Sequence, residues 1–186
     1  MASSPKTEVI HHSYMRHTTL SPFSLLLPII VGCSTPSFKV DLHTPSHTAG
    51  ISNITVQDAR LDKTLSMAVI EPGGVNLPTL LPDPALHLAL EKYIAQAWVG
   101  GPVSQTVTVA LQEIDLKNRV GFLKNDDQTC RIESQVVVTD QTNPRPIRTF
   151  VRNSDNASPM VYNAARIILQ ACLQQHANEI VSSLAR

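Results

Sequence analysis

The sequence lacks the charge pattern of a nucleic-acid-binding protein. Lysine and arginine together number 15, as do aspartate and glutamate, and no basic stripe interleaved with aromatic residues occurs along the 186 residues. Affinity for a phosphate backbone depends on clustered positive charge. We therefore expect no nucleic-acid partner.

The sequence also lacks the motifs of common catalytic and metal sites. It contains no G-x-S-x-G elbow, no glycine-rich phosphate loop and no H-E-x-x-H pair. His43 and His47 are four residues apart, but the proline between them opposes a helical metal pair. His87 and His176 are interpreted as exposed surface residues. We expect no enzyme activity, no metal and no cofactor.

Charged residues are scarce for a disordered chain, at 16% against 42% hydrophobic residues. That balance is typical of a globular domain. Removal of an N-terminal export segment would leave about 150 residues, close to the usual size of one domain. We expect a single domain over residues 51–186.

No apolar run is long enough to span a bilayer, but one has the length of a signal-peptide core. Leu20–Val31 carries no charge, whereas a membrane-spanning helix needs about 20 apolar residues. Arg16 precedes the run and supplies the expected positive charge. We predict a signal peptide over residues 1–32, and its proportions suit a start at Met15 better than one at Met1. The alternative, a buried segment of the fold, is opposed by the two prolines inside the run.

The residues after this run resemble the lipobox of bacterial lipoproteins. They are Ile30, Val31, Gly32 and Cys33. The resemblance implies that signal peptidase recognises the first three, that diacylglycerol is attached to the Cys33 sulfur, and that the mature chain begins at Cys33. Ser34 stands where an aspartate would favour the inner membrane. The resemblance therefore implies a lipid anchor in the outer membrane, with the domain facing the periplasm.

Residues 33–50 form the lipidated N-terminus and a stretch rich in serine, threonine, proline and histidine. This composition is typical of a flexible tether between a lipid and a folded domain.

Alternating apolar and polar residues predict five strands in the remaining chain. We expect them near residues 54–56, 65–69, 107–116, 130–138 and 147–151, with a bulge near Gln112. The last three resemble an antiparallel meander.

Two helices are predicted from cap signals and apolar stripes. Asp83 followed by Pro84 suits an N-cap and first helical position, with the helix ending near Trp98. Ser158 and Pro159 repeat this signature before a helix that runs nearly to the C-terminus. The order ββαβββα predicts an α+β fold, a mostly antiparallel sheet of about five strands with two helices packed on one face.

Two cysteines remain once lipid is assigned to Cys33. A periplasmic location would permit a disulfide between Cys130 and Cys172, joining a strand to the C-terminal helix. Both positions are apolar in pattern, so two buried free thiols are the alternative.

Two smaller features have a structural and a functional interpretation. Val120, Phe122 and Leu123 form either an exposed partner-docking surface or an extension of the preceding strand. Asp58 and Arg60 are two residues apart at the end of a predicted strand, so their side chains point to the same side. We interpret them as a structural ion pair.

The whole arrangement resembles the YajG-like family of bacterial lipoproteins. The resemblance rests on the lipobox, the tether, the strand end Val56–Arg60, the helix before a glycine-rich break, the meander and the long C-terminal helix. It implies an outer-membrane lipoprotein without an assigned reaction. We expect a non-catalytic binding or auxiliary subunit of the cell envelope, with an envelope protein or a second copy as partner. The alternatives are an auxiliary lipoprotein of an envelope transport system and an envelope enzyme with an unrecognised site.

Overall fold

The computed structural model describes residues 36–46, 53–98, 106–120, 127–139, 143–154 and 161–185. The chain divides into two units, Met1–Cys33 and Ser34–Arg186. All the described residues lie in the second unit.

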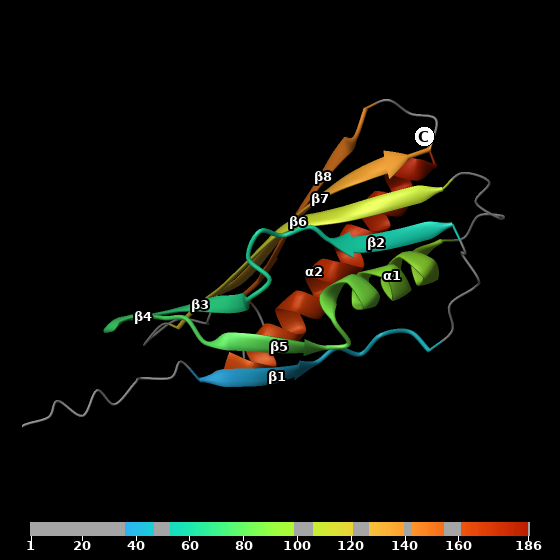
Figure 1. The fold of residues 1–186 in the computed structure, drawn as a ribbon. Coiled ribbons are helices and arrows are strands. Elements are labelled where there is room, and N and C mark those ends of the chain that lie inside the picture. Colours follow the sequence, from blue (N-terminus) through green and yellow to red (C-terminus); the bar gives the residue numbers. More distant parts are fainter. Residues whose placement is uncertain are drawn as a thin grey trace, which may run out of the picture. The chain divides into compact units, whose positions relative to one another are not determined.

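The described part of the chain is a mixed α+β domain with two helices and eight strands, not the predicted five (Figure 1). The elements are β1 (Ser37–Asp41), β2 (Ile54–Asp58), β3 (Leu65–Glu71), β4 (Gly74–Asn76), β5 (Thr79–Asp83), α1 (Leu86–Ala97), β6 (Val107–Arg119), β7 (Asp127–Val138), β8 (Arg145–Asn153) and α2 (Val161–Leu184). The sheet order is β1-β5-β3-β6-β7-β8, with β2 paired to β6 and β4 paired to β3.

The predicted meander is confirmed. β6 pairs antiparallel with β7, and β7 pairs antiparallel with β8. The register of β6 against β7 shifts between Leu111 and Glu113, so the bulge lies at Gln112 as predicted. The bulge reverses which residues of β6 point inward, because side chains alternate along a strand.

The first two predicted strands exist, but they do not pair with each other. β2 and β3 both run parallel to β6 along the same edge, β2 beside Val107–Leu111 and β3 beside Leu116–Arg119. β1 and β5 also pair in parallel. The sheet is therefore mixed rather than built from neighbouring hairpins alone.

The flexible tether predicted up to residue 50 is wrong for the part that the structure describes. Ser37–Asp41 forms β1, and Val40 is fully buried. Hydrogen-bonded pairing with β5 and burial of Val40 outweigh a local composition that favours a linker.

The Pro-rich segment before α1 holds two strands that the sequence did not predict. β4 folds back on β3 after a turn that ends at Gly74, whose φ of 149° favours glycine. β5 then ends at Asp83, and α1 begins only at Leu86, with no side-chain cap. The predicted capping role of Asp83 is wrong, because its carboxylate lies 2.8 Å from the Lys39 Nζ on the neighbouring strand.

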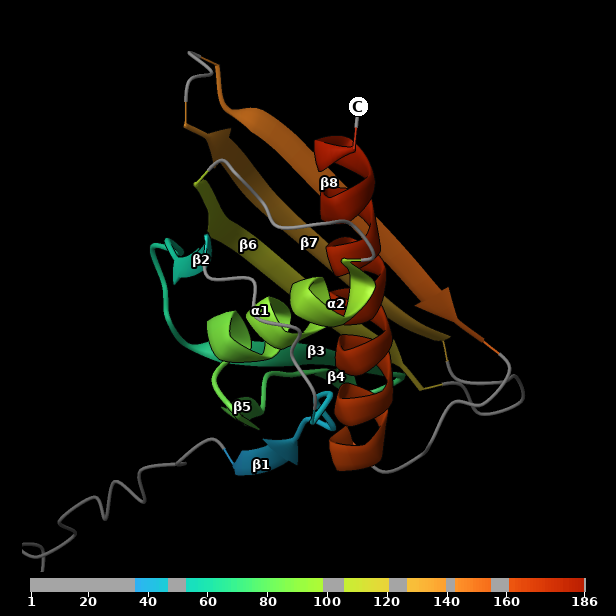
Figure 2. The ribbon, with the colours of Figure 1, turned by 90° about the vertical axis from the view of Figure 1, so that its right-hand side faces the viewer.

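Both helices lie on the same face of the sheet (Figure 2). α1 buries most of its predicted stripe, and the inward residues of α2 pack over β7 and β8. The larger fully buried side chains are Met67, Leu80, Leu90, Ile94, Leu111, Leu116, Ile132, Ile168, Leu169, Leu173, His176 and Ile180. Neither described helix is both long enough and apolar enough to cross a membrane.

Candidate functional site

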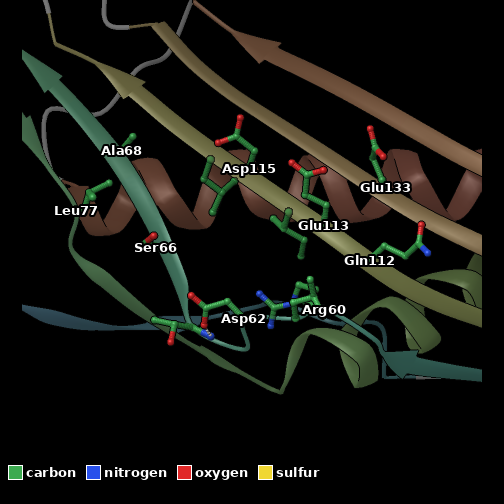
Figure 3. A pocket seen from close by; sticks show the side chains of 13 residues that line it. Arg60, Asp62, Ser66, Ala68, Leu77, Gln112, Glu113, Asp115 and Glu133 are labelled. Carbon is green, nitrogen blue, oxygen red and sulfur yellow. Dashed lines mark hydrogen bonds between the residues drawn. The ribbon is translucent and has the colours of Figure 1, made fainter.

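A pocket of about 550 Å³ lies on the sheet face opposite the helices. Figure 3 views this face with the α2 ribbon behind the sheet. The pocket lies where the chain between β2 and β3 passes the bulge in β6. Its lining residues are Arg60, Leu61, Asp62, Thr64, Ser66, Ala68, Leu77, Gln112, Glu113, Ile114, Asp115, Leu116 and Glu133.

The pocket arises because two stretches of chain of unequal length run side by side. The chain takes nine residue steps from Asp58 to Met67, whereas β6 takes five from Leu111 to Leu116. The β2 pairing reaches one residue further, since the Ala59 amide donates to the Leu111 carbonyl at 2.8 Å. The remaining residues leave the edge of β6 as the loop 60–64, which forms one wall.

An ion pair fixes this loop, as the sequence predicted. Arg60 donates from Nε to Asp58 Oδ1 at 2.9 Å and from Nη2 to Asp58 Oδ2 at 2.8 Å. Arg60 Nη2 also donates to the Lys63 carbonyl at 3.1 Å. The hydrogen bonds from Arg60 to the Asp58 carboxylate lower the pKa of Asp58 to about 2. The bidentate geometry gives the loop a defined shape.

Carboxylates form the polar wall of the pocket, and cations balance them. Arg131 Nη2 lies 3.0 Å from Glu113 Oε2 and 3.3 Å from Glu133 Oε1. Lys117 Nζ lies 2.7 Å from Asp115 Oδ2. These partly exposed pairs contribute little to stability and can exchange partners with an incoming polar group. Among the described residues, no three histidine, cysteine or acidic side chains are placed to hold a metal ion.

The pocket also has an apolar side. Leu61 is fully exposed at its mouth, Leu77 is half-exposed, and Ile114 lies between the acidic residues of β6. Leu77 and Glu133 lie at opposite ends of the pocket in Figure 3. The arrangement suits a ligand with one apolar end and one polar end, because each end of the ligand then meets surface of its own kind.

A second polar cluster lies between the sheet and α2 and corrects one prediction. His176, predicted to be exposed, is fully buried. Its Nε2 lies 2.8 Å from Ser134 Oγ on β7, and its Nδ1 lies 2.7 Å from Thr149 Oγ1 on β8. Thr149 Oγ1 in turn donates to Glu179 Oε2. One placement of the protons satisfies all four groups. The hydroxyl of Ser134 donates to Nε2 of His176, and Nδ1–H of His176 donates to Thr149.

This cluster resembles a nucleophile with its base, but a substrate cannot reach it. Ser134 is 2% exposed and His176 is fully buried. Burial lowers the pKa of His176 to about 4, so the imidazole is neutral near pH 7. The cluster therefore holds α2 against β7 and β8 by satisfying buried polar groups, which makes it structural.

The two remaining cysteines lie near this cluster, because Cys172 precedes His176 by about one turn of α2. Cys130 on β7 and Cys172 on α2 form a disulfide, with Cα atoms 6.2 Å apart. The sequence allowed either a disulfide or two buried free thiols, and the structure has the disulfide.

The residues predicted as a partner surface are only partly described. Val120 packs partly buried against the core, and its amide donates to the Ile70 carbonyl at 2.9 Å. It therefore follows β6 directly and keeps the hydrogen-bonded pairing with β3. Phe122 and Leu123 lie outside the described residues, as do Cys33, Ser34 and the lipobox residues Ile30, Val31 and Gly32. His87 is half-buried on α1 rather than exposed.

Sequence reasoning identified the Asp58–Arg60 pair and the bulge at Gln112 but not the pocket between them. Parallel pairing of β2 and β3 with β6 brings these features together, and that pairing leaves no local signal in the sequence.

Comparisons with known proteins give distant likenesses of fold. No family model matches the chain, and no curated protein matches it. The crystal structure of protein XCC0632 from Xanthomonas campestris, described with the family model DUF330, has a TM-score of 0.47 and 10% identity, over 78% of this chain and 92% of that chain. A second solved structure, of an uncharacterized protein, has a TM-score of 0.42 and 12% identity, over 81% of this chain and 99% of that chain. Neither likeness is close enough to carry an argument about family or activity.

Proposed function

We propose that this chain is a lipoprotein of the bacterial cell envelope, anchored in the outer membrane through lipid on Cys33 and facing the periplasm. Its role is that of a non-catalytic binding or auxiliary subunit. The observation that carries the binding role is the pocket beside the loop 60–64, which combines exposed leucines with a wall of carboxylates. A large concave site with convergent polar groups is the usual form of a binding site.

The burial of the serine–histidine cluster supports a binding role over a catalytic one. A nucleophile must contact its substrate, and Ser134 is enclosed between the sheet and α2. The lining residues of the pocket include no histidine and no cysteine. The alternative of an envelope enzyme would need a different nucleophile and base.

An auxiliary subunit of an envelope transport system is one form of this proposal. Such a subunit needs a membrane anchor and a site for a partner or a transported molecule. The apolar and polar ends of the pocket suit an amphipathic molecule. Membership of the YajG-like family remains a prediction.

Site-specific crosslinking in intact cells tests the binding role. We expect a photo-crosslinking residue placed at Leu61 to yield a discrete adduct, because Leu61 projects at the mouth of the pocket. The same residue at Leu88, which is exposed on α1, is the matched control and should not yield that adduct. The pocket-filling substitution Ala68→Trp should abolish the adduct. Identical adducts from both positions, or no effect of Ala68→Trp, would contradict the proposal.

A further inference from the structure

A second, smaller cavity lies where β1 begins. It has a volume of about 360 Å³ and is lined mostly by apolar residues. Its lining residues are Pro36, Phe38, Val69, Glu71, Asn76, Leu77 and Pro78. The cavity thus brings the start of β1 together with the bend between β4 and β5, and Figure 1 shows both at the same end of the sheet.

Three exposed apolar side chains lie on the segment that runs from β4 through the bend into β5, and one of them, Leu77, also lines this cavity. Val75 on β4 is 61% exposed, Leu77 in the bend is 54% exposed, and Leu81 on β5 is 53% exposed. We refer to these three residues as the β4–β5 edge. A solvated protein surface rarely groups large aliphatic side chains on one short segment unless something covers them.

The position of Cys33 indicates what covers them. Cys33 precedes Pro36 by three residues, which span at most about 11 Å when fully extended. From Ser37 onward the chain is fixed in the sheet by its pairing with β5, where Ser37 lies opposite Thr79. The chain that follows Cys33 therefore enters the sheet beside β5, next to the β4–β5 edge.

We infer that the β4–β5 edge rests on the bilayer surface and forms a second membrane contact beside the lipid. This inference rests on the proposed acylation of Cys33. The contact is apolar, since all three of its residues are aliphatic, and Lys39, the exposed cation opposite Leu81, pairs with Asp83 at 2.8 Å and Asp41 at 3.4 Å. Aliphatic side chains of such a surface enter the region between headgroups and acyl chains.

The contact also orients the pocket beside the loop 60–64. Leu77 lines both cavities, so the Leu77 end of that pocket lies beside the proposed membrane contact. A molecule with an acyl end and a polar end would enter it from the bilayer side.

Fluorescence quenching by lipids brominated on their acyl chains tests the contact. The chain has one tryptophan, Trp98, so Trp98→Phe gives a silent background for single reporters. The reporters are Leu77→Trp and Leu81→Trp, and the control is Phe150→Trp, because Phe150 is exposed on β8 at the far edge of the sheet. Each acylated full-length protein is reconstituted into vesicles of phosphatidylethanolamine and phosphatidylglycerol.

We expect severalfold stronger quenching from position 77 or 81 than from position 150, unchanged when salt is raised. Equal quenching at all three positions, none at positions 77 and 81, or loss of the quenching in high salt would overturn the apolar contact. Intact-mass measurement of the same samples separates failure of the apolar contact from failure of the lipid anchor. An unacylated Cys33 overturns the anchor, whereas an acylated chain without quenching overturns only the contact.

Discussion

His176 Nε2 and Ser134 Oγ lie 2.8 Å apart in the interior of the domain, joining α2 to the middle strand of the meander. The histidine is neutral in this setting, because burial lowers its pKa to about 4. In the unfolded chain its pKa is about 6.5.

The buried histidine makes stability depend on pH. The lowered pKa of His176 adds to the free energy of unfolding above pH 6.5, and this contribution is lost as the pH falls toward 4. Over that range the unfolded chain binds a proton that the folded chain excludes. At pH 5 this loss amounts to about 2 kcal/mol. Urea unfolding at pH 7.5 and pH 5 measures it. His176→Gln should be less stable at pH 7.5 and lack this loss, whereas His87→Gln should retain it. An unchanged pH dependence in His176→Gln would contradict the assignment.

The Asp58–Arg60 pair should shape the loop as well as stabilise it. Asp58→Asn removes a bidentate partner from a nearly buried guanidinium, so we expect a loss of roughly 1–3 kcal/mol in the free energy of unfolding. The pKa of Asp58 lies below its usual 3.8, so its contribution is present above pH 3.8 and is lost as the pH falls toward 2. Denaturant unfolding measures the loss. Asp62→Asn, in the same loop but more exposed, is the control, and equal losses in both variants would refute a special role for Asp58.

The disulfide should contribute strongly to stability. It links residues 42 positions apart, for which loop entropy gives about 4 kcal/mol. We expect the double substitution Cys130→Ala and Cys172→Ala to lower the melting temperature, and reductant to lower that of the wild type. Thiol labelling of the unfolded, unreduced chain should find neither cysteine free. A melting temperature that does not respond to reductant or to the double substitution would contradict this prediction.

Asn118 is a site where a substitution should stabilise the protein. It is fully buried on β6, and neither of its amide atoms has a hydrogen-bond partner in the described part of the chain. Asn118→Leu keeps the branched shape and the number of side-chain heavy atoms and removes two unpaired polar atoms, so we expect a gain of about 1–3 kcal/mol in the free energy of unfolding by urea. Asn76→Leu, at an exposed position of β4, should change stability little. A loss in Asn118→Leu would mean that the amide is paired in solution.

The sequence predicted the parts of the fold that depend on local patterns. The strands around Val109, Val136 and Thr149 alternate cleanly and join through short connections, so their antiparallel pairing follows from neighbouring segments. The strands β1, β4 and β5 were missed because each is short and lies in a segment rich in proline or small polar residues. Their partners hold them in place, and pairing between distant segments cannot be derived from composition.

His176 shows a second kind of failure. Its polar neighbours Gln174, Gln175 and Asn178 suggested an exposed position. Spacing was the better guide, because His176 follows the buried Cys172 by four residues and precedes the buried Ile180 by four. A polar residue on the buried stripe of a helix needs partners from the facing sheet, here Ser134 and Thr149.

Intact-mass spectrometry of the membrane fraction, from wild type and from Cys33→Ala, tests the central claim most directly. We predict a wild-type mass that corresponds to a chain starting at Cys33 plus acyl groups, and the absence of that species in the variant. An uncleaved and unmodified wild-type chain in the soluble fraction would contradict the anchor and return Leu20–Val31 to the folded part of the protein.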